Sequence, residues 1–122
     1  MEIVPEAIEN AKENAERNGI ENAEFFCSDA SMLVPKLIEK SISPNVVILD
    51  PPRKGSDPHT LAAIVRSGAS RVVYVSCNPA TLARDVKFLT ESGYMMKNVC
   101  AVDMFPNTGH VECVVLMSRG DK

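Results

Sequence analysis

Apolar residues along this chain fall into short, nearly continuous runs separated by longer segments of mixed character. Residues 45–49 and 71–75 form the two clearest runs, and residues 23–27 form a weaker one. Nearly continuous apolar runs of about five residues are typical of strands buried on both faces of a parallel sheet. The pattern therefore predicts three strands of an α/β sheet.

Four of the intervening segments are predicted to be helices. Proline stands at the start of three of them, while Gly19 and Gly93 follow two of the ends, and both placements are favoured at helix termini. Pro35 interrupts one helix near its middle. The predicted helices cover residues 5–18, 31–40, 58–67 and 79–92.

The last part of the chain has a different pattern. Residues 95–104 and 110–118 are further strand candidates, joined by the turn-forming residues 106–109, and we expect them to pair as antiparallel neighbours. The alternation of strands and helices predicts an α/β sheet, mostly parallel with an antiparallel C-terminal hairpin. Ligands of such sheets bind beyond the carboxyl ends of the strands. No repeat or linker divides residues 1–122, which are therefore treated as one unit.

Composition narrows the class of protein. Hydrophobic residues make up 45% of the 122 positions, which is enough for a packed core. No apolar run approaches the ~20 residues of a membrane span, and the N-terminus lacks a signal-peptide pattern, so we expect a cytoplasmic protein without membrane contact. The net charge is −3, but residues 1–40 carry −5 and residues 41–122 carry +2. If the chain binds a nucleic acid, its second part is the better candidate for contact.

Cys77 is the most informative of the four cysteines, which are Cys27, Cys77, Cys100 and Cys113. No spacing among them is that of a zinc or redox motif, so we expect reduced thiols and no metal site. Cys77 stands between a predicted strand and a predicted helix, with Asn78 as N-cap and Pro79 as first helical residue. The partial positive charge of a helix N-terminus favours a thiolate. Cys77 is therefore either an activated nucleophile or an inert buried thiol.

Asp50 and Arg53 flank a stiff loop directly after the apolar run 45–49. Pro51 and Pro52 hold Asp50 at the predicted sheet edge. Its carboxylate either accepts hydrogen bonds from a base or cofactor, or serves as a turn residue. Arg53, taken alone, is an ordinary surface charge.

Glu112 follows the turn at residues 106–109 and precedes the apolar residues 113–117. In a strand it shares a face with His110. A carboxylate at this position suits a general acid or base, and the alternative is a solvated glutamate near a turn. His110 is interpreted as structural, because no second metal ligand has suitable spacing.

Three motifs occur in a fixed order: DPPRKG from Asp50, VVYVSCNPAT from Val72 and VDMFPNTGHVE from Val102. Together with the opening EIVPEAIENAKENAERNGI, this set resembles the RNA uracil-5-methyltransferases, which form 5-methyluridine in tRNA and ribosomal RNA. The resemblance covers nearly the whole chain. One departure is Asn107, where the family pattern implies a glutamine or histidine.

The resemblance implies a Rossmann-like methyltransferase sheet and methyl transfer from S-adenosylmethionine to RNA through a covalent adduct. Cys77 would attack carbon 6 of uracil, and Glu112 would remove the proton from carbon 5 after methylation. The target base would have to leave its stack to reach the sulfur.

The resemblance also implies binding roles for four residues. Glu2 would hold the ribose hydroxyls of the cofactor, Asp29 would lie near its adenine, and Asp50 would lie near both cofactor and base. Arg53 would contact the active-site loop or RNA. From the residues alone, Glu2 is a near-terminal residue and Asp29 is an equally good helix N-cap.

The family's first strand and glycine-rich cofactor loop would precede Glu2. We therefore expect the C-terminal part of a catalytic domain, whose sheet lacks its first strand and closes up, pairs with another chain, or keeps an open edge through which copies self-associate. We also expect weak or no cofactor binding and no methylation by this chain alone. Two other functions stay open: an amino-methylating enzyme, which the DPPR loop loosely resembles, and a non-catalytic module that binds RNA or a protein partner.

Overall fold

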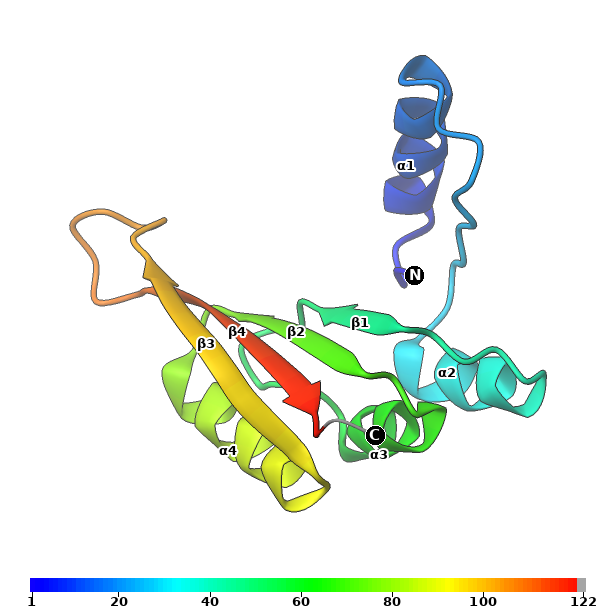
Figure 1. Cartoon of the computed structure of the whole chain (residues 1–122). Helices are drawn as coiled ribbons and strands as arrows, with labels where there is room; N and C mark the ends of the chain where they lie inside the picture. The colour runs from blue at the N-terminus through cyan, green and yellow to red at the C-terminus, as the bar shows by residue number, and fades with distance from the viewer. Residues whose placement is uncertain (121–122) are drawn as a thin grey trace.

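The computed structural model describes residues 1–120 (Figure 1). Its helices are α1 (Pro5–Arg17), α2 (Ala30–Glu39), α3 (Pro58–Ser67) and α4 (Pro79–Glu91), and its strands are β1 (Val46–Leu49), β2 (Arg71–Ser76), β3 (Tyr94–Val102) and β4 (Glu112–Arg119). All four predicted helices are confirmed. None of the helices in the described residues is both long and apolar enough to cross a membrane.

The four strands form one sheet in the order β1-β2-β4-β3. β1 is parallel to β2, whereas β4 is antiparallel to both of its neighbours, so β1, β2 and β3 run in the same direction. The predicted α/β sheet with an antiparallel C-terminal hairpin is thereby confirmed. Within residues 1–120, β1 is an outer strand of the sheet and leaves its edge open.

The core lies between the sheet and helices α3 and α4, which cover one face of the sheet (Figure 1). Each buried aliphatic or aromatic side chain of this kind contributes roughly 1.5–3 kcal/mol to folding. β2 and α4, the two elements on either side of Cys77, are thus held in a fixed relation. The core residues are Leu61, Ile64, Val72, Tyr74, Leu82, Leu89, Tyr94, Val115 and Met117.

The expectation that β1 is buried on both faces is wrong. Val46 and Ile48 are 45% and 71% exposed, while Val47 and Leu49 on the opposite face pack against the core. An apolar strand sequence predicts burial only where another element covers both faces, and none of the described helices covers the face that carries Ile48 (Figure 1).

The predicted strand at residues 23–27 is also wrong. This segment makes one isolated parallel bridge, between Glu2 and Cys27, in which the Glu2 amide donates to the Phe26 carbonyl at 3.1 Å. The Ser28 amide donates in turn to the Glu2 carbonyl at 2.9 Å. Apolar residues form a strand only beside a partner, and the segment lies outside the sheet, next to α1 (Figure 1).

The connection between β3 and β4 is longer than predicted, and it leaves His110 outside the strand. Thr108 closes this loop, because its hydroxyl donates to the Phe105 carbonyl at 2.7 Å and accepts from the His110 amide at 3.2 Å. Asn107 adopts a φ of 63°, a left-handed conformation that asparagine tolerates better than most residues. Glu112, at the start of β4, remains in the strand as predicted.

Candidate active site

Cys77 lies at the junction of β2 and α4, as the sequence predicts. The Ser76 hydroxyl fixes this turn by accepting from the Asn78 amide and donating to the Asn78 carbonyl, both at 3.0 Å. Asn78 is the N-cap of α4, since its Oδ1 accepts from the Ala80 amide at 3.0 Å. Cys77 is partly buried and in no disulfide. Its thiol therefore stands at a well-formed helix N-terminus.

The register of β2 and β4 ends close to both Cys77 and Glu112. The last pair of this ladder is Ser76 with Cys113, and Cys77 and Glu112 are the residues that directly adjoin this pair. The register therefore brings Cys77 and Glu112 to the same end of the sheet. Glu112 is partly buried, and its Oε2 is the one buried side-chain oxygen or nitrogen of the described residues that lacks a hydrogen-bond partner. Such unpartnered atoms are rare, and this one is available to a ligand or a proton.

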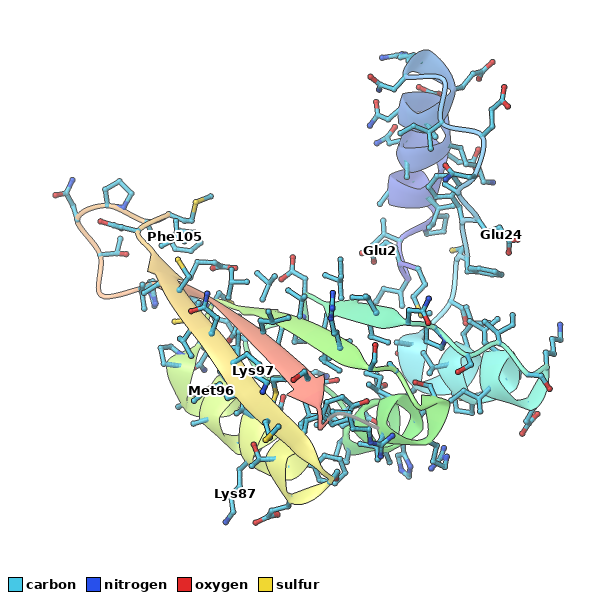
Figure 2. All side chains as sticks on the ribbon, viewed as in Figure 1. Glu2, Glu24, Lys87, Met96, Lys97 and Phe105 are labelled. Carbon is cyan, nitrogen blue, oxygen red and sulfur yellow. The ribbon has the colours of Figure 1, made fainter. Side chains whose placement is uncertain are left out.

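Glu2, Asp29 and Asp50 line a single cavity of about 620 Å³ beside β1. This volume is within the range of small-molecule binding sites, about 300–1,000 Å³. Figure 2 shows Glu2 at the end of α1 that is nearer the sheet, and it shows Phe105 of the β3–β4 loop far from Glu2. Three of the predicted site residues are thus brought together from segments far apart in the sequence.

Each of these carboxylates has a defined environment. Oδ1 of Asp29 accepts from the Ser31 hydroxyl at 2.6 Å and from the Ser31 amide at 2.8 Å, which confirms the N-cap alternative. These hydrogen bonds, aided by the positive charge of Lys54, lower the pKa of Asp29 below its ordinary value. Oε1 of Glu2 accepts from the amides of the next two residues, at 2.7 and 3.1 Å. Asp50 is exposed.

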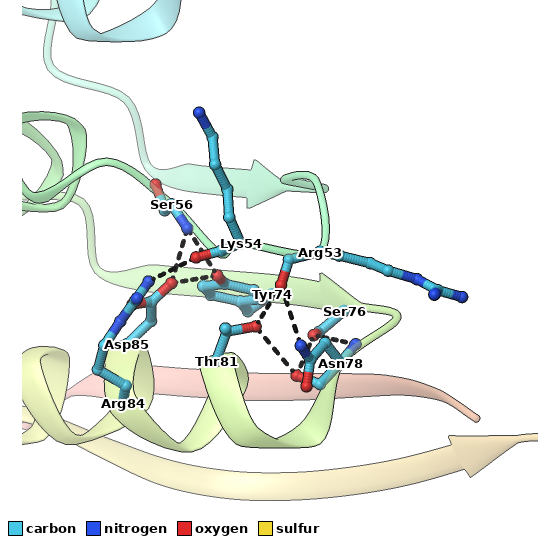
Figure 3. Close-up of polar contacts among 9 residues, drawn as sticks. All are labelled: Arg53, Lys54, Ser56, Tyr74, Ser76, Asn78, Thr81, Arg84 and Asp85. Carbon is cyan, nitrogen blue, oxygen red and sulfur yellow. Dashed lines mark hydrogen bonds and ion pairs between the residues drawn. The ribbon is translucent and has the colours of Figure 1, made fainter. Parts of the chain in front are cut away.

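The predicted site residues form two groups, because neither Cys77, Glu112 nor Arg53 lines the cavity. Residues 50–57 link the groups. Asp50 faces the cavity, whereas the Arg53 carbonyl accepts from Thr81 Oγ1 at 2.9 Å and from Asn78 Nδ2 at 3.2 Å. Figure 3 shows the Arg53 side chain extending away from these contacts. Within residues 1–120, no group of three or more His, Cys, Asp or Glu side chains is placed to hold a metal ion.

Sequence reasoning missed Asp85, a buried carboxylate beside this loop. Asp85 is 1% exposed and accepts from the Tyr74 hydroxyl, the Ser56 amide and the Arg84 guanidinium (Figure 3). Burial, together with the hydrogen bond to Asp85, raises the pKa of Tyr74. A sequence signal existed, because Asp85 is three residues after Leu82 and four before Leu89, on the apolar stripe of α4.

Comparisons with known proteins give a consistent result. The family described as tRNA (Uracil-5-)-methyltransferase matches residues 1–120. An uncharacterized RNA methyltransferase of Clostridium acetobutylicum is 56% identical over 122 residues, which are 100% of this chain and 26% of that protein. Another from Bacillus cereus is 55% identical, with the same coverage of 100% and 26%. The chain thus spans about a quarter of the length of these relatives.

A solved structure shares the fold. The Pyrococcus abyssi tRNA (uracil-54, C5)-methyltransferase in complex with S-adenosyl-L-homocysteine has a TM-score of 0.78 and 38% sequence identity to this chain. The match covers 94% of this chain and 27% of that one. It confirms that the sheet and its helices are those of a Rossmann-like methyltransferase.

Proposed function

The chain belongs to the tRNA (uracil-5-)-methyltransferase family, and from this premise we propose that the protein methylates carbon 5 of uridine in tRNA or ribosomal RNA. The observation that carries the proposal is that Cys77 and Glu112 both adjoin the last β2–β4 pair, Ser76 with Cys113, and that Glu112 Oε2 is buried without a partner. The Clostridium and Bacillus relatives are named RNA methyltransferases, and the Pyrococcus enzyme is named for a tRNA uracil, which supports RNA as the substrate.

The cavity suits S-adenosylmethionine by its chemistry. Carboxylates accept hydrogen bonds from ribose hydroxyls and from the adenine amino group, and four of them line the cavity: Glu2, Asp29, Asp50 and Asp57. Glu2 is assigned to the ribose, Asp29 to the adenine end, and Asp50 to the end nearest the reacting base. When bound, S-adenosylmethionine supplies an electrophilic methyl group on a positively charged sulfur.

Cys77 acts as the nucleophile. Its thiolate forms a bond to carbon 6 of the uracil ring, and the electron pair of the carbon 5–carbon 6 double bond moves onto the ring as an enolate. Carbon 5 then becomes nucleophilic enough to take the methyl group, which it is not in free uracil. Cys77 stands directly before Asn78, the N-cap of α4, so the nucleophile is presented at the start of a helix. The uridine must be flipped out of its stack to reach the sulfur.

Glu112 acts as the general base that ends the reaction. Its carboxylate removes the proton from the methylated carbon 5, the double bond re-forms, and the sulfur leaves carbon 6 as a thiolate. The unpartnered Oε2 is suited to receive that proton. Arg53 is exposed in the linking loop and is assigned to contact RNA phosphate or the active-site loop.

A chimaera provides the test. In the Clostridium chimaera, this chain replaces the matched segment of the Clostridium acetobutylicum relative. We expect 5-fluorouridine-containing RNA to form a covalent complex with it, because fluorine at carbon 5 cannot leave as a proton. Peptide mapping should place the RNA on Cys77, Cys77→Ala should abolish the complex, and Cys100→Ala should retain it. Methylation that survives in Cys77→Ala would contradict the mechanism and favour an amino-methylating enzyme.

A further inference from the structure

We propose that Asp85 is a positioning residue for this reaction, which sets the cofactor cavity relative to Cys77 by holding residues 53–56 against α4. The inference rests on the proposed function and adds a residue to it. Asp85 does not line the cavity itself, but its partner Ser56 does, so Asp85 acts through the loop that joins the cavity to the Cys77 turn.

The loop needs such support, because residues 50–57 contain no regular helix or strand. Its only backbone hydrogen bond within the segment runs from the Gly55 amide to the Pro52 carbonyl, at 2.9 Å. At one end Asp50 lines the cavity, and three residues later the Arg53 carbonyl accepts a hydrogen bond from Asn78, the residue after Cys77. A shift of the loop therefore changes the separation of the two groups of site residues.

Side chains from the first two turns of α4 hold three backbone groups of the loop (Figure 3). Thr81 and Asn78 donate to the Arg53 carbonyl, as described above. Arg84 Nη2 donates to the Lys54 carbonyl at 3.0 Å, and the Ser56 amide donates to Asp85 Oδ2 at 2.7 Å. The turn that presents Cys77 and the helix that holds the loop are thus one continuous segment.

Asp85 is the buried centre of these contacts. The Tyr74 hydroxyl donates to its Oδ2, and Arg84 Nε donates to its Oδ1 at 2.8 Å. Tyr74 lies on β2, three residues before Cys77, so the carboxylate ties the loop to both elements that meet at the nucleophile. A buried ion is a poor means of stabilising a core, where a well-packed apolar side chain serves as well. The hydrogen bonds of Asp85 are directional, and they instead fix the position of the loop.

Positioning of this kind affects rate, because a misplacement of about 1 Å can slow an enzymatic step by roughly a hundredfold. In the Clostridium chimaera, Asp85→Asn keeps one acceptor oxygen and replaces the other with an NH2 donor, so the side chain can no longer accept from Ser56, Tyr74 and Arg84 together. The matched control is Leu89→Val, a buried change on the same helix one turn further from the loop. Adduct formation with 5-fluorouridine RNA is measured at saturating RNA and S-adenosylmethionine, at a temperature where circular dichroism shows both variants folded.

We expect Asp85→Asn to slow adduct formation at least about tenfold and to speed amide exchange at Ser56, while Leu89→Val lowers the melting temperature and leaves the rate unchanged. If Asp85→Asn does not fold, Thr81→Val provides a second test of how α4 holds the loop. It removes the hydrogen bond from Thr81 to the Arg53 carbonyl and should also slow adduct formation. An unchanged rate in the folded variant would overturn the positioning role. A wild-type chimaera that forms no adduct would instead overturn the proposed function, so the two failures are distinguishable.

Discussion

A β-carbon on Gly55 would lie 2.7 Å from Oδ2 of Asp85, and closer still to Nη2 of Arg84. Gly55 also has a φ of +83°, in the left-handed region that side chains disfavour. Glycine is therefore required twice at this position, once by the backbone conformation and once by the approach of α4. The two requirements can be separated experimentally.

Gly55→Ala should destabilise the chain more than Gly19→Ala. Gly19 has a φ of +65°, and a β-carbon there would meet no atom within 4 Å, so alanine should lower the free energy of unfolding by about 1–2 kcal/mol through backbone strain alone. Gly55→Ala should cost about 1–3 kcal/mol more, because Arg84 and Asp85 must move. Urea unfolding of the 122-residue chain measures both values, and equal losses would show that the contact is unimportant.

Glu112→Gln should leave the covalent complex unresolved. An amide cannot take the carbon 5 proton, so turnover of the Clostridium chimaera should fall by about 10²–10⁴-fold. Unmodified RNA should then accumulate as a methylated protein–RNA adduct on denaturing gels. Glu91→Gln is the matched control, because Glu91 is exposed and pairs only with Lys87 at 3.8 Å. Release of product at the wild-type rate in Glu112→Gln would assign the proton to another base.

Tyr74 should make the folded chain sensitive to alkali. Burial and the Asp85 carboxylate raise the pKa of Tyr74 above its ordinary value of 10, so the folded state holds the phenol proton more tightly than the unfolded state. The resulting stabilisation is complete below pH 10 and is lost as the pH rises through the folded-state pKa.

The corresponding experiment compares urea midpoints of the wild type and Tyr74→Phe from neutral pH to above pH 10. Tyr74→Phe should lose about 1 kcal/mol at neutral pH, because Asp85 loses a donor, and should show a shallower decline in alkali. Tyr94, whose pKa is also raised by burial, accounts for the decline that remains. Parallel curves for the two proteins would contradict the assignment.

Asp29 should contribute to stability in the opposite pH range. Its pKa lies below 3.8 in the folded state because Ser31 donates two hydrogen bonds to the carboxylate. The stabilisation is therefore present above pH 3.8 and is lost as the pH falls through the folded-state pKa. Asp29→Ala should be less stable than wild type at neutral pH, and the difference should shrink in acid. Ser31→Ala, which removes only the hydroxyl donor, should give an intermediate result.

Local features of the site were predictable from the sequence, whereas features that depend on distant partners were not. Asn78 and Pro79 mark the start of α4 by their own chemistry, so the position of Cys77 at a helix N-terminus follows directly. The placement of Cys77 and Glu112 at the same end of the sheet depends on the β2–β4 register, for which only the family resemblance gave grounds. The exposure of Ile48 depends on what covers the sheet, which strand propensity does not encode.

The contacts to residues 53–56 were hidden for a different reason. On the loop, these contacts use backbone groups: the Arg53 and Lys54 carbonyls accept, and the Ser56 amide donates. Because such groups do not depend on residue type, the sequence does not indicate which of them form hydrogen bonds. Only Asp85 was recognisable from the sequence, because it is a carboxylate among the apolar positions of α4. A charged residue on an apolar helix face is therefore worth testing as the centre of a polar network.

The amide of Asn78 performs two tasks at once, since its oxygen caps α4 and its nitrogen binds the Arg53 carbonyl. Exchange of the loop at residues 50–57 by itself would remove the backbone partners of the α4 side chains. A foreign loop would meet a helix shaped for the original one, and the graft would misalign donor and acceptor. Residues 50–85 contain the loop, Tyr74 and the α4 side chains that hold the loop, so a graft has to include this continuous stretch.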